Sequence, residues 1–189
     1  MCHAKFVHLY RSVAVLLRSV RGEAVTLRIA RISLVFSVAL FYAFLVFNNL
    51  TDYNSNFQFI RHVLMMDSTF PGNNGMWRAI NAPGLHTLFY LGIIVWESLT
   101  LVLLVWGGLR LARAVRSSSQ VFRGASDVAI AGLTLSLLMW LVAFLSAGGE
   151  WFLMWQSKIW NGQEAAFRMF TIVGIILIFL VQGEREELP

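Results

Sequence analysis

The stretch LFYLGIIVWESLTLVLLVW, residues Leu88 to Trp106, decides the fold of this chain. It is apolar along almost its whole length, and about 20 apolar helical residues are needed to cross a hydrocarbon core of about 30 Å. The stretch therefore predicts a membrane-spanning helix. One carboxylate, Glu97, lies near its middle, and an ionised side chain at that depth is energetically costly.

The composition of the whole chain indicates the same class of protein. Its 189 residues are 58% hydrophobic and only 13% charged, whereas soluble domains are about half apolar and about one quarter charged. We therefore expect an integral membrane protein with a single domain. The lone Cys2 excludes an internal disulfide and any site built from several thiolates within one chain.

Three further stretches are long and apolar enough to span a membrane. The four predicted spans are residues 31–50, 84–109, 127–149 and 164–182. Pro83 suits the first turn of the second span, and Ser126 can cap the third. Asn161 stands three residues before Glu164, which is the spacing of a capping box at the start of the fourth. The expected fold is all-α, with four transmembrane helices in one bundle.

This pattern divides the chain into three parts. They are a basic N-terminal segment over residues 1–28, a four-helix transmembrane domain over 29–182 and a cytoplasmic tail over 183–189. Residues 6–29 mix apolar side chains with arginines, which favours either an interfacial amphipathic helix or a frayed basic tail. We expect the N-terminus to stay attached, because no small-residue cleavage site follows its apolar run.

The basic residues indicate how the bundle is oriented. Ten of the 15 lysines and arginines lie either before the first span or between the second and the third. The positive-inside rule assigns this side to the cytoplasm. We therefore expect a multi-pass protein of the inner, cytoplasmic membrane with both termini in the cytoplasm. Nucleic acid is not expected as a partner, because aromatic residues do not alternate with these basic ones.

Two segments are expected on the outer face. The first, residues 51–84, has about thirty residues and is too long for a plain connection. Phe57, Ile60, Val63 and Leu64 recur in it at helical spacing, so we expect a short helix that lies on the membrane or covers the bundle. The second, residues 148–163, is compact and rich in tryptophan.

Three stretches carry a resemblance to a known family. They are NNLTDYNSNFQFIRHVLMMDSTFP from residue 48, HTLFYLGIIVWE from residue 86 and GGEWFLMWQSKIWNGQEAAFR from residue 148. Together they resemble a bacterial family of predicted small integral membrane proteins, catalogued as a domain of unknown function, over roughly residues 29–182. The resemblance implies a four-helix inner-membrane protein and supplies no activity, cofactor or catalytic residue.

Glu97 belongs to a polar stripe on the second predicted span. His86, Tyr90 and Glu97 are separated by 4 and 7 residues, close to whole helical turns, so they share one face. We expect this face to point into the bundle, since buried acids usually find partners there. Glu97 is either a neutral, hydrogen-bonded structural acid or a titrating group on a proton or cation path. Without a cationic partner we expect the neutral form.

A second candidate site is the polar and aromatic group expected on the outer face. Its members are His62, Asp67, Glu150, Trp151, Trp155, Glu164 and Arg168. His62, His86 and Glu150 could together bind a transition metal, although their spacing is not diagnostic. The alternative is a hydrogen-bonded network that attaches the long loop to the bundle. Glu164 and Arg168 are expected to form a pair on one helix.

The tryptophans of the outer segments allow two interpretations. Trp77, Trp151, Trp155 and Trp160 are typical of an aromatic belt at the membrane interface. They could instead form a cage for an organic cation, closed by Glu150. We also expect the two outer segments to pack on each other, with Trp155 as a candidate buried residue.

No nucleophile constellation, phosphate-binding loop or paired-acid signature occurs in the sequence, so no enzyme is indicated. Three functions remain open: a structural or accessory membrane component, as an oligomer or as a subunit of a larger complex; a small transporter coupled to protons or cations through Glu97; and a periplasm-facing protein that binds a metal or another cofactor. The lipid bilayer is the partner common to all three.

Overall fold

The structure is a computed structural model that describes the backbone of residues 2–182 and the side chains of residues 25–182. All of its regular elements are helical. In chain order they are α1 (Cys2–Thr51), α2 (Tyr53–Met65), η1 (Met76–Arg78), α3 (Pro83–Ala114), α4 (Ser119–Ala125), α5 (Asp127–Leu138), η2 (Met139–Trp151), η3 (Met154–Gln156) and α6 (Gln163–Val181). The side chains that would make residues 6–24 amphipathic, and the tail at 183–189, lie outside the described residues.

Four helical segments are long and apolar enough to cross a membrane. They cover Val25–Thr51, Pro83–Arg113, Asp127–Trp151 and Gln163–Val181. The all-α fold with four such helices is therefore confirmed. The first of them is the C-terminal part of α1, which runs without a break from the basic N-terminal segment into the span.

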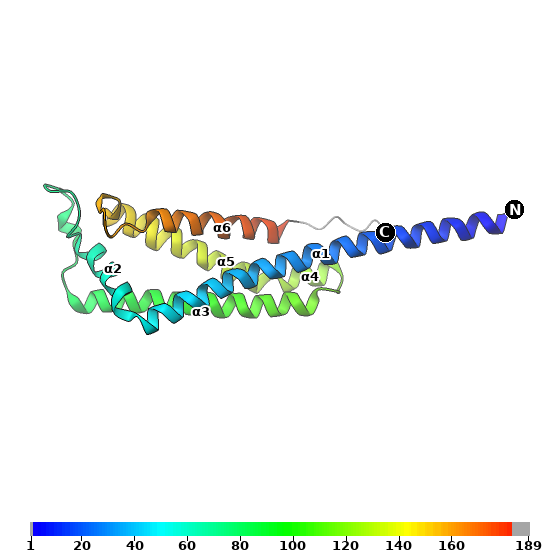
Figure 1. Cartoon of the computed structure of the whole chain (residues 1–189), viewed down its shortest axis with the longest axis horizontal. Helices are drawn as coiled ribbons and strands as arrows, with labels where there is room; N and C mark the ends of the chain where they lie inside the picture. Colours follow the sequence, from blue (N-terminus) through cyan, green and yellow to red (C-terminus); the bar gives the residue numbers. More distant parts are fainter. Residues whose placement is uncertain (1, 183–189) are drawn as a thin grey trace.

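The four long helices lie side by side along one axis (Figure 1). α1 packs on α3, α3 packs on α5, and α6 packs on α5, η2 and α1. The connection between α3 and α5, which includes α4, lies at one end together with the basic half of α1; we call this the basic end. The elements α2, η1 and η3 lie at the other end of the bundle, which we call the α2 end.

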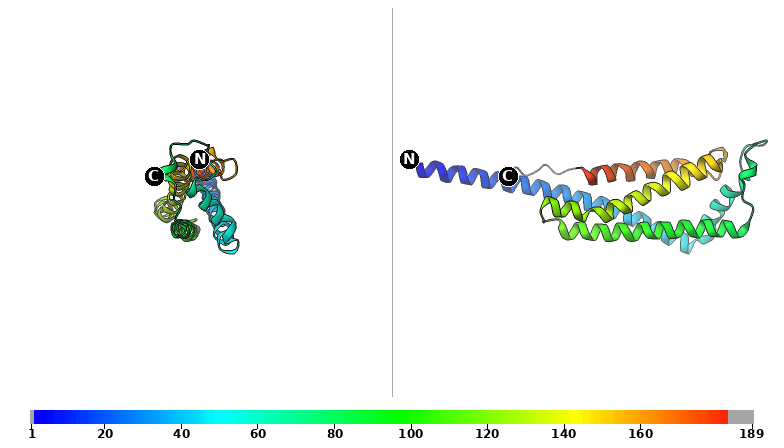
Figure 2. Two further views of the ribbon diagram at one scale, coloured as in Figure 1. Left: turned by 90° about the vertical axis from the view of Figure 1, so that its left-hand side faces the viewer. Right: turned by 180° about the vertical axis from the view of Figure 1, so that it is seen from behind.

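Glycine allows α3 and α5 to meet closely near the basic end. A Cβ atom at position 107 would lie only 2.6 Å from the Cα atom of Ala129, and one at position 108 would lie 2.8 Å from the ring of Phe36. Small residues at such crossings let helix backbones approach each other. From this contact α5 and η2 diverge from α3 toward the α2 end (Figure 2, right).

Two arginines of α1 bind the ends of other helices. Arg28 donates hydrogen bonds to the carbonyls of Val115 (3.1 Å) and Ser117 (2.6 Å), just after α3 ends. Arg31 donates to the carbonyls of Phe179 (3.1 Å) and Gln182 (2.7 Å) at the end of α6. Both arginines are buried. They satisfy carbonyls that have no partner within their own helices and lie at the negative ends of the helix dipoles.

The third span is not a uniform α-helix. From Met139 to Trp151 it is a π-helix of 13 residues, and the amide of Phe152 continues the pattern with a hydrogen bond to the carbonyl of Ala147. π-Helical segments are usually single turns and frequently mark functional sites. The prediction of a helix over 127–149 was therefore right about the span but missed this change in its hydrogen bonding.

We predict that Gly107→Ala destabilises the bundle, because its methyl group would collide with the backbone of Ala129, which cannot rotate away. Overpacking of this kind costs about 1–3 kcal/mol. Gly174→Ala is the matched control: a Cβ atom there meets only Leu137, at 3.9 Å. Thermal unfolding in mild detergent should show a lower melting temperature for Gly107→Ala and no decrease for Gly174→Ala. Equal melting temperatures would contradict the close contact.

Candidate functional site

The polar stripe of α3 lies inside the bundle. His86, Tyr90 and Glu97 have only 2%, 1% and 3% of their surfaces exposed, as expected for residues that face the other helices. Their spacing along α3 accounts for this, because residues separated by whole turns share a helix face. The exposed positions of α3 carry large apolar side chains, among them Leu88 and Val95.

Glu97 has a partner on α1. The Nδ2 atom of Asn49 donates a hydrogen bond to Oε2 of Glu97 at 2.5 Å. The hydroxyl of Tyr90 in turn donates to Oδ1 of Asn49 at 3.2 Å. Both the nitrogen and the oxygen of the Asn49 side-chain amide are therefore hydrogen-bonded, and the row Tyr90–Asn49–Glu97 connects α3 to α1. Both partners of Asn49 are buried, so this hydrogen bonding is protected from competition with water.

Asn49 was not among the candidate residues predicted from the sequence. It follows Tyr42 by seven residues, which is two helical turns, and both side chains are buried on the same face of α1. The spacing of two whole turns between these two polar residues of the first span was the signal that could have identified it.

A second polar contact crosses the bundle closer to the basic end. The hydroxyl groups of Tyr42 on α1 and Ser136 on α5 share a hydrogen bond of 2.8 Å. Trp96 of α3 donates through Nε1 to the carbonyl of Leu135 at 3.1 Å. Polar contacts therefore connect α5 to both α1 and α3.

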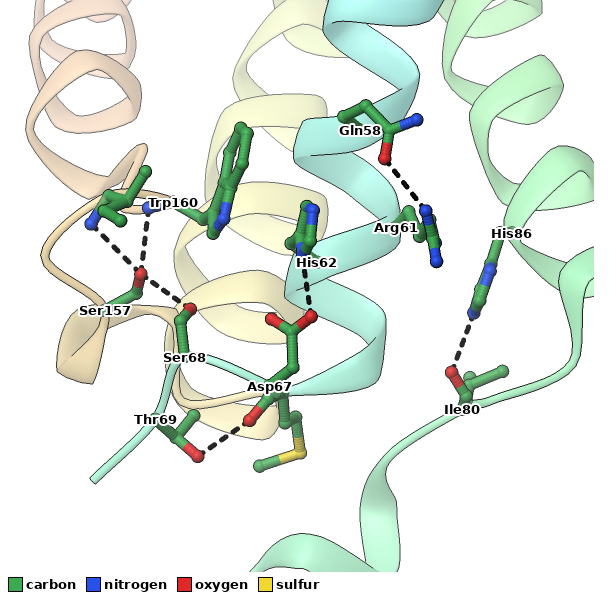
Figure 3. A network of polar contacts seen from close by, with 12 residues as sticks. Gln58, Arg61, His62, Asp67, Ser68, Thr69, Ile80, His86, Ser157 and Trp160 are labelled. Carbon is green, nitrogen blue, oxygen red and sulfur yellow. Dashed lines mark hydrogen bonds and ion pairs between the residues drawn. The ribbon is translucent and has the colours of Figure 1, made fainter. Parts of the chain in front are cut away.

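His86 does not belong to the row that contains Glu97. Its Nε2 atom lies 2.8 Å from the carbonyl oxygen of Ile80 (Figure 3). A carbonyl only accepts, so this nitrogen carries the proton. Ile80 also donates its amide to the carbonyl of Leu64 in α2. His86 consequently holds the chain that enters α3 close to α2.

At the α2 end, His62 has partners of its own. Its Nδ1 atom lies 2.6 Å from Oδ2 of Asp67, and its ring stacks on Trp160 with centroids 4.6 Å apart. Figure 3 shows His62 and Asp67 paired and His86 directed at a different partner. The pair follows from the turn after α2, where Met66 adopts a left-handed conformation and brings Asp67 back toward the helix.

The three residues suggested for a metal site are not brought together. His62 engages Asp67, His86 engages a backbone carbonyl, and the side chain of Glu150 is exposed. Among the described residues, no group of three or more His, Cys, Asp and Glu side chains could hold a metal ion. The physical reason is that His62 and His86 belong to different helices and each has a hydrogen-bond partner within the chain.

The two connecting segments at the α2 end pack on each other, which confirms the expectation from the sequence. Ser68 donates to the hydroxyl oxygen of Ser157 at 2.8 Å, and the amide of Phe70 donates to Gln156 at 3.0 Å. Beneath these contacts lies an apolar cluster of Val63, Leu64, Met66, Phe152 and Met154. The long loop is therefore attached to the rest of the bundle by hydrogen bonds and apolar contacts, which is the alternative to a metal site.

The tryptophans lie mainly on the surface. Trp151 and Trp155 are about half exposed, so the expectation that Trp155 is a buried residue was wrong; Phe152 and Met154 are the buried residues of this segment. Exposed tryptophans at the end of the spans are typical of an aromatic belt.

The suggested cation cage already contains a cation from the chain itself. The guanidinium of Arg78 lies 5.7 Å from the ring centroid of Trp77 and 5.4 Å from that of Trp151. Glu150 contributes its carbonyl oxygen, 3.5 Å from Arg78, in place of its carboxylate. Because Arg78 takes the cation position at these rings, the arrangement does not favour an external organic cation.

Glu164 and Arg168 form the predicted pair on α6. Their side chains lie 3.4 Å apart and are largely exposed. A pair in such surroundings contributes little to stability. Among the described residues, the hydrogen bonds of the row that contains Glu97 involve neither of them.

Comparison with protein-family models places this arrangement in a known family. Residues 27–183 match the model described as predicted small integral membrane protein (DUF2165). The chain belongs to this family. The match begins within the first span and includes all four candidate spans apart from the first two residues of that span. No curated protein and no solved structure matches the chain.

Membership of the family makes the chain an integral membrane protein, and the exposed apolar surfaces of its spans therefore face hydrocarbon. This explains the large apolar side chains on the outside of the bundle, such as Phe44, Val102 and Ile175. The polar groups inside the bundle then have only other protein groups as partners. Without the hydrogen bond between them, the side chains of Asn49 and Glu97 would lack a water molecule to replace the lost partner.

We predict that Phe152→Ala destabilises this membrane protein much more than Trp155→Ala. Phe152 is 7% exposed within the apolar cluster at the α2 end, whereas Trp155 is 45% exposed. Removing a buried phenylalanine side chain typically costs about 3–5 kcal/mol. Thermal unfolding in mild detergent should therefore show a large decrease in melting temperature for Phe152→Ala only. A decrease of the same size for Trp155→Ala would show that the tryptophan is the residue on which the segment packs.

Proposed function

We propose that this protein is a structural or accessory component of the inner membrane, and that its buried polar groups serve to hold the helices in register. The observation that carries this proposal is the pairing of Glu97 with Asn49. An intramembrane acid is by default a candidate functional group. Here its hydrogen-bond partner comes from the same chain and from the neighbouring helix.

The other buried polar contacts support the same role. Tyr42 with Ser136 and Trp96 with Leu135 connect α5 to α1 and α3, so three of the four spans are joined by hydrogen bonds. Interhelical hydrogen bonds of this kind stabilise bundles inside membranes. The arginines that bind the ends of α3 and α6 extend this network to the basic end.

A small transporter coupled to protons or cations is the second candidate. It is favoured by one observation, the row Tyr90–Asn49–Glu97, which runs along the bundle and ends on a carboxyl group. The row favours the structural role more, because Asn49 and Tyr90 are both buried and join two helices.

Substitutions at Glu97 distinguish the two functions. Glu97→Gln keeps an oxygen that can accept from Asn49, so we expect an unchanged melting temperature. Glu97→Leu leaves the side-chain N–H of Asn49 without its acceptor, and an unsatisfied buried donor costs about 1–3 kcal/mol. Ser98→Ala is a matched control, since the hydroxyl of Ser98 donates to the carbonyl of Ile94 within its own helix.

The same variants should be reconstituted in vesicles that contain a pH-sensitive dye. The structural role predicts that wild type and Glu97→Gln show the same proton permeability. Proton flux in the wild type that disappears in Glu97→Gln and persists in Ser98→Ala would overturn the structural proposal in favour of transport.

The proposed orientation has both termini in the cytoplasm. It rests on the basic end, where ten of the 15 lysines and arginines lie. Arg28, Arg31 and Arg110 belong to these ten and also donate hydrogen bonds to backbone carbonyls. Their positions therefore serve the packing of the helices as well as the orientation in the membrane.

Single cysteines test this orientation in a Cys2→Ser background. Ser157 is a poor reporter because it is buried and hydrogen-bonded, so we choose the exposed Lys158 at the α2 end and the exposed Gln120 at the basic end. In cells with a permeabilised outer membrane, an impermeant thiol reagent should label Lys158→Cys alone. Labelling of Gln120→Cys alone would indicate the opposite orientation, with both termini outside the cytoplasm.

A further inference from the structure

An apolar cavity of about 500 Å³ lies between α2, α3 and η2. The residues that line it belong to the part of the bundle where η2 and α3 diverge toward the α2 end (Figure 2, right). α2 contributes Phe59 and Ile60, α3 contributes Gly92 and Trp96, and η2 contributes Phe144. We call this cavity the lateral groove.

All side chains that line the lateral groove are apolar. The single polar atom among them is the indole nitrogen of Trp96, and it is engaged by the carbonyl of Leu135. A polar head group would therefore find no side-chain hydrogen bond inside, and burying it unpaired would be unfavourable. The part of any ligand that enters the groove must be hydrocarbon.

The groove is continuous with the surface that faces the membrane lipids. Leu88 and Phe89 of α3 and Val142 of η2 line it, and these side chains are 63%, 46% and 48% exposed. All three belong to candidate spans. Because the chain is an integral membrane protein, its lipid-facing surface extends without interruption into the groove.

The size of the groove decides between an acyl chain and a protein helix. A helix with its side chains is about 10–12 Å in diameter, so a volume of about 500 Å³ would accommodate only about one turn. A single alkyl chain is much narrower and can lie in the groove along its length. The volume thus fits one lipid tail and not a transmembrane segment of a partner.

We propose that the lateral groove binds one acyl chain of a membrane phospholipid, held between α3 and η2 and covered on one side by α2. The π-helix contributes five residues to the lining: Val142, Ala143, Phe144, Ala147 and Gly148. Trp96 forms the limit toward the basic end, where its hydrogen bond to Leu135 keeps α3 and α5 together. The binding site is distinct from the row that contains Glu97.

Gly92 offers a way to fill the groove without disturbing the fold. A Cβ atom there meets nothing within 4 Å, so the side chain introduced by Gly92→Leu would extend into open space. Gly84→Leu is the matched control. Position 84 is on the same helix, is equally free of neighbours and does not line the groove.

The test uses the full chain in phosphatidylcholine vesicles that contain a phospholipid with a photoreactive group in its acyl chain. After illumination, peptide mass spectrometry should locate cross-links on the half-buried groove residues Ile93, Trp96 and Phe144 in the wild type and in Gly84→Leu. In Gly92→Leu these cross-links should decrease severalfold, while those on the exposed residues Val105 and Ile175 stay unchanged. Undiminished cross-linking of Ile93, Trp96 and Phe144 in Gly92→Leu would overturn the proposal.

Two further measurements address misfolding of the variant and self-association of the chain. The melting temperature of Gly92→Leu in detergent should equal that of the wild type, which would show that the variant folds. Added phospholipid should raise the melting temperature of the wild type and of Gly84→Leu more than that of Gly92→Leu. If Gly92→Leu instead converts an oligomer to a monomer and phospholipid has no effect on the wild type, the occupant is a second copy of the chain and the proposal is wrong.

Discussion

The close contact between α3 and α5 at Gly107 is the constraint on which the arrangement of the helices depends. At this point the backbone of one helix meets the backbone of the other, and no side chain separates them. Two straight helices that touch near one end must separate toward the other unless they are parallel. The space between α3 and η2 at the α2 end, and with it the lateral groove, follows from this contact. α2 then covers one side of the space with its apolar face.

The membrane environment determines how the polar groups of the bundle are satisfied. Water does not compete for them, so each donor and acceptor needs a partner within the protein. Asn49 meets this requirement for Glu97 and Tyr90, and Arg28 and Arg31 meet it for carbonyls at the ends of α3 and α6. These contacts have different chemistry but the same effect: each joins α1 to another helix. α1 is consequently held along its length, from the basic end to Asn49.

The sequence was sufficient to predict features that depend on hydrophobicity along a single helix. The four spans follow from the length of their apolar runs, and the shared face of His86, Tyr90 and Glu97 follows from helical periodicity. Features that depend on two segments could not be predicted in the same way. The partner of Glu97 required knowledge of which helix lies beside α3, and the role of Arg28 was concealed because a buried and an exposed arginine look alike in a basic segment. The separation of His62 from His86 likewise depends on how α2 lies relative to α3. The π-helix leaves no pattern in the sequence that differs from that of an apolar α-helix.

The row that contains Glu97 and the lateral groove are related through neighbouring residues of α3. Trp96 and Glu97 follow each other in the sequence, so their side chains leave the helix about 100° apart, given about 3.6 residues per turn. Glu97 is directed toward Asn49 on α1, and Trp96 toward Leu135 on α5 and the lateral groove. The hydrogen bond on one side therefore restrains the rotation of α3 about its own axis, and that rotation determines which residues line the groove. A structural role for Glu97 is thus compatible with a binding function elsewhere in the bundle, because the acid holds one side of the groove in place without contacting what the groove binds.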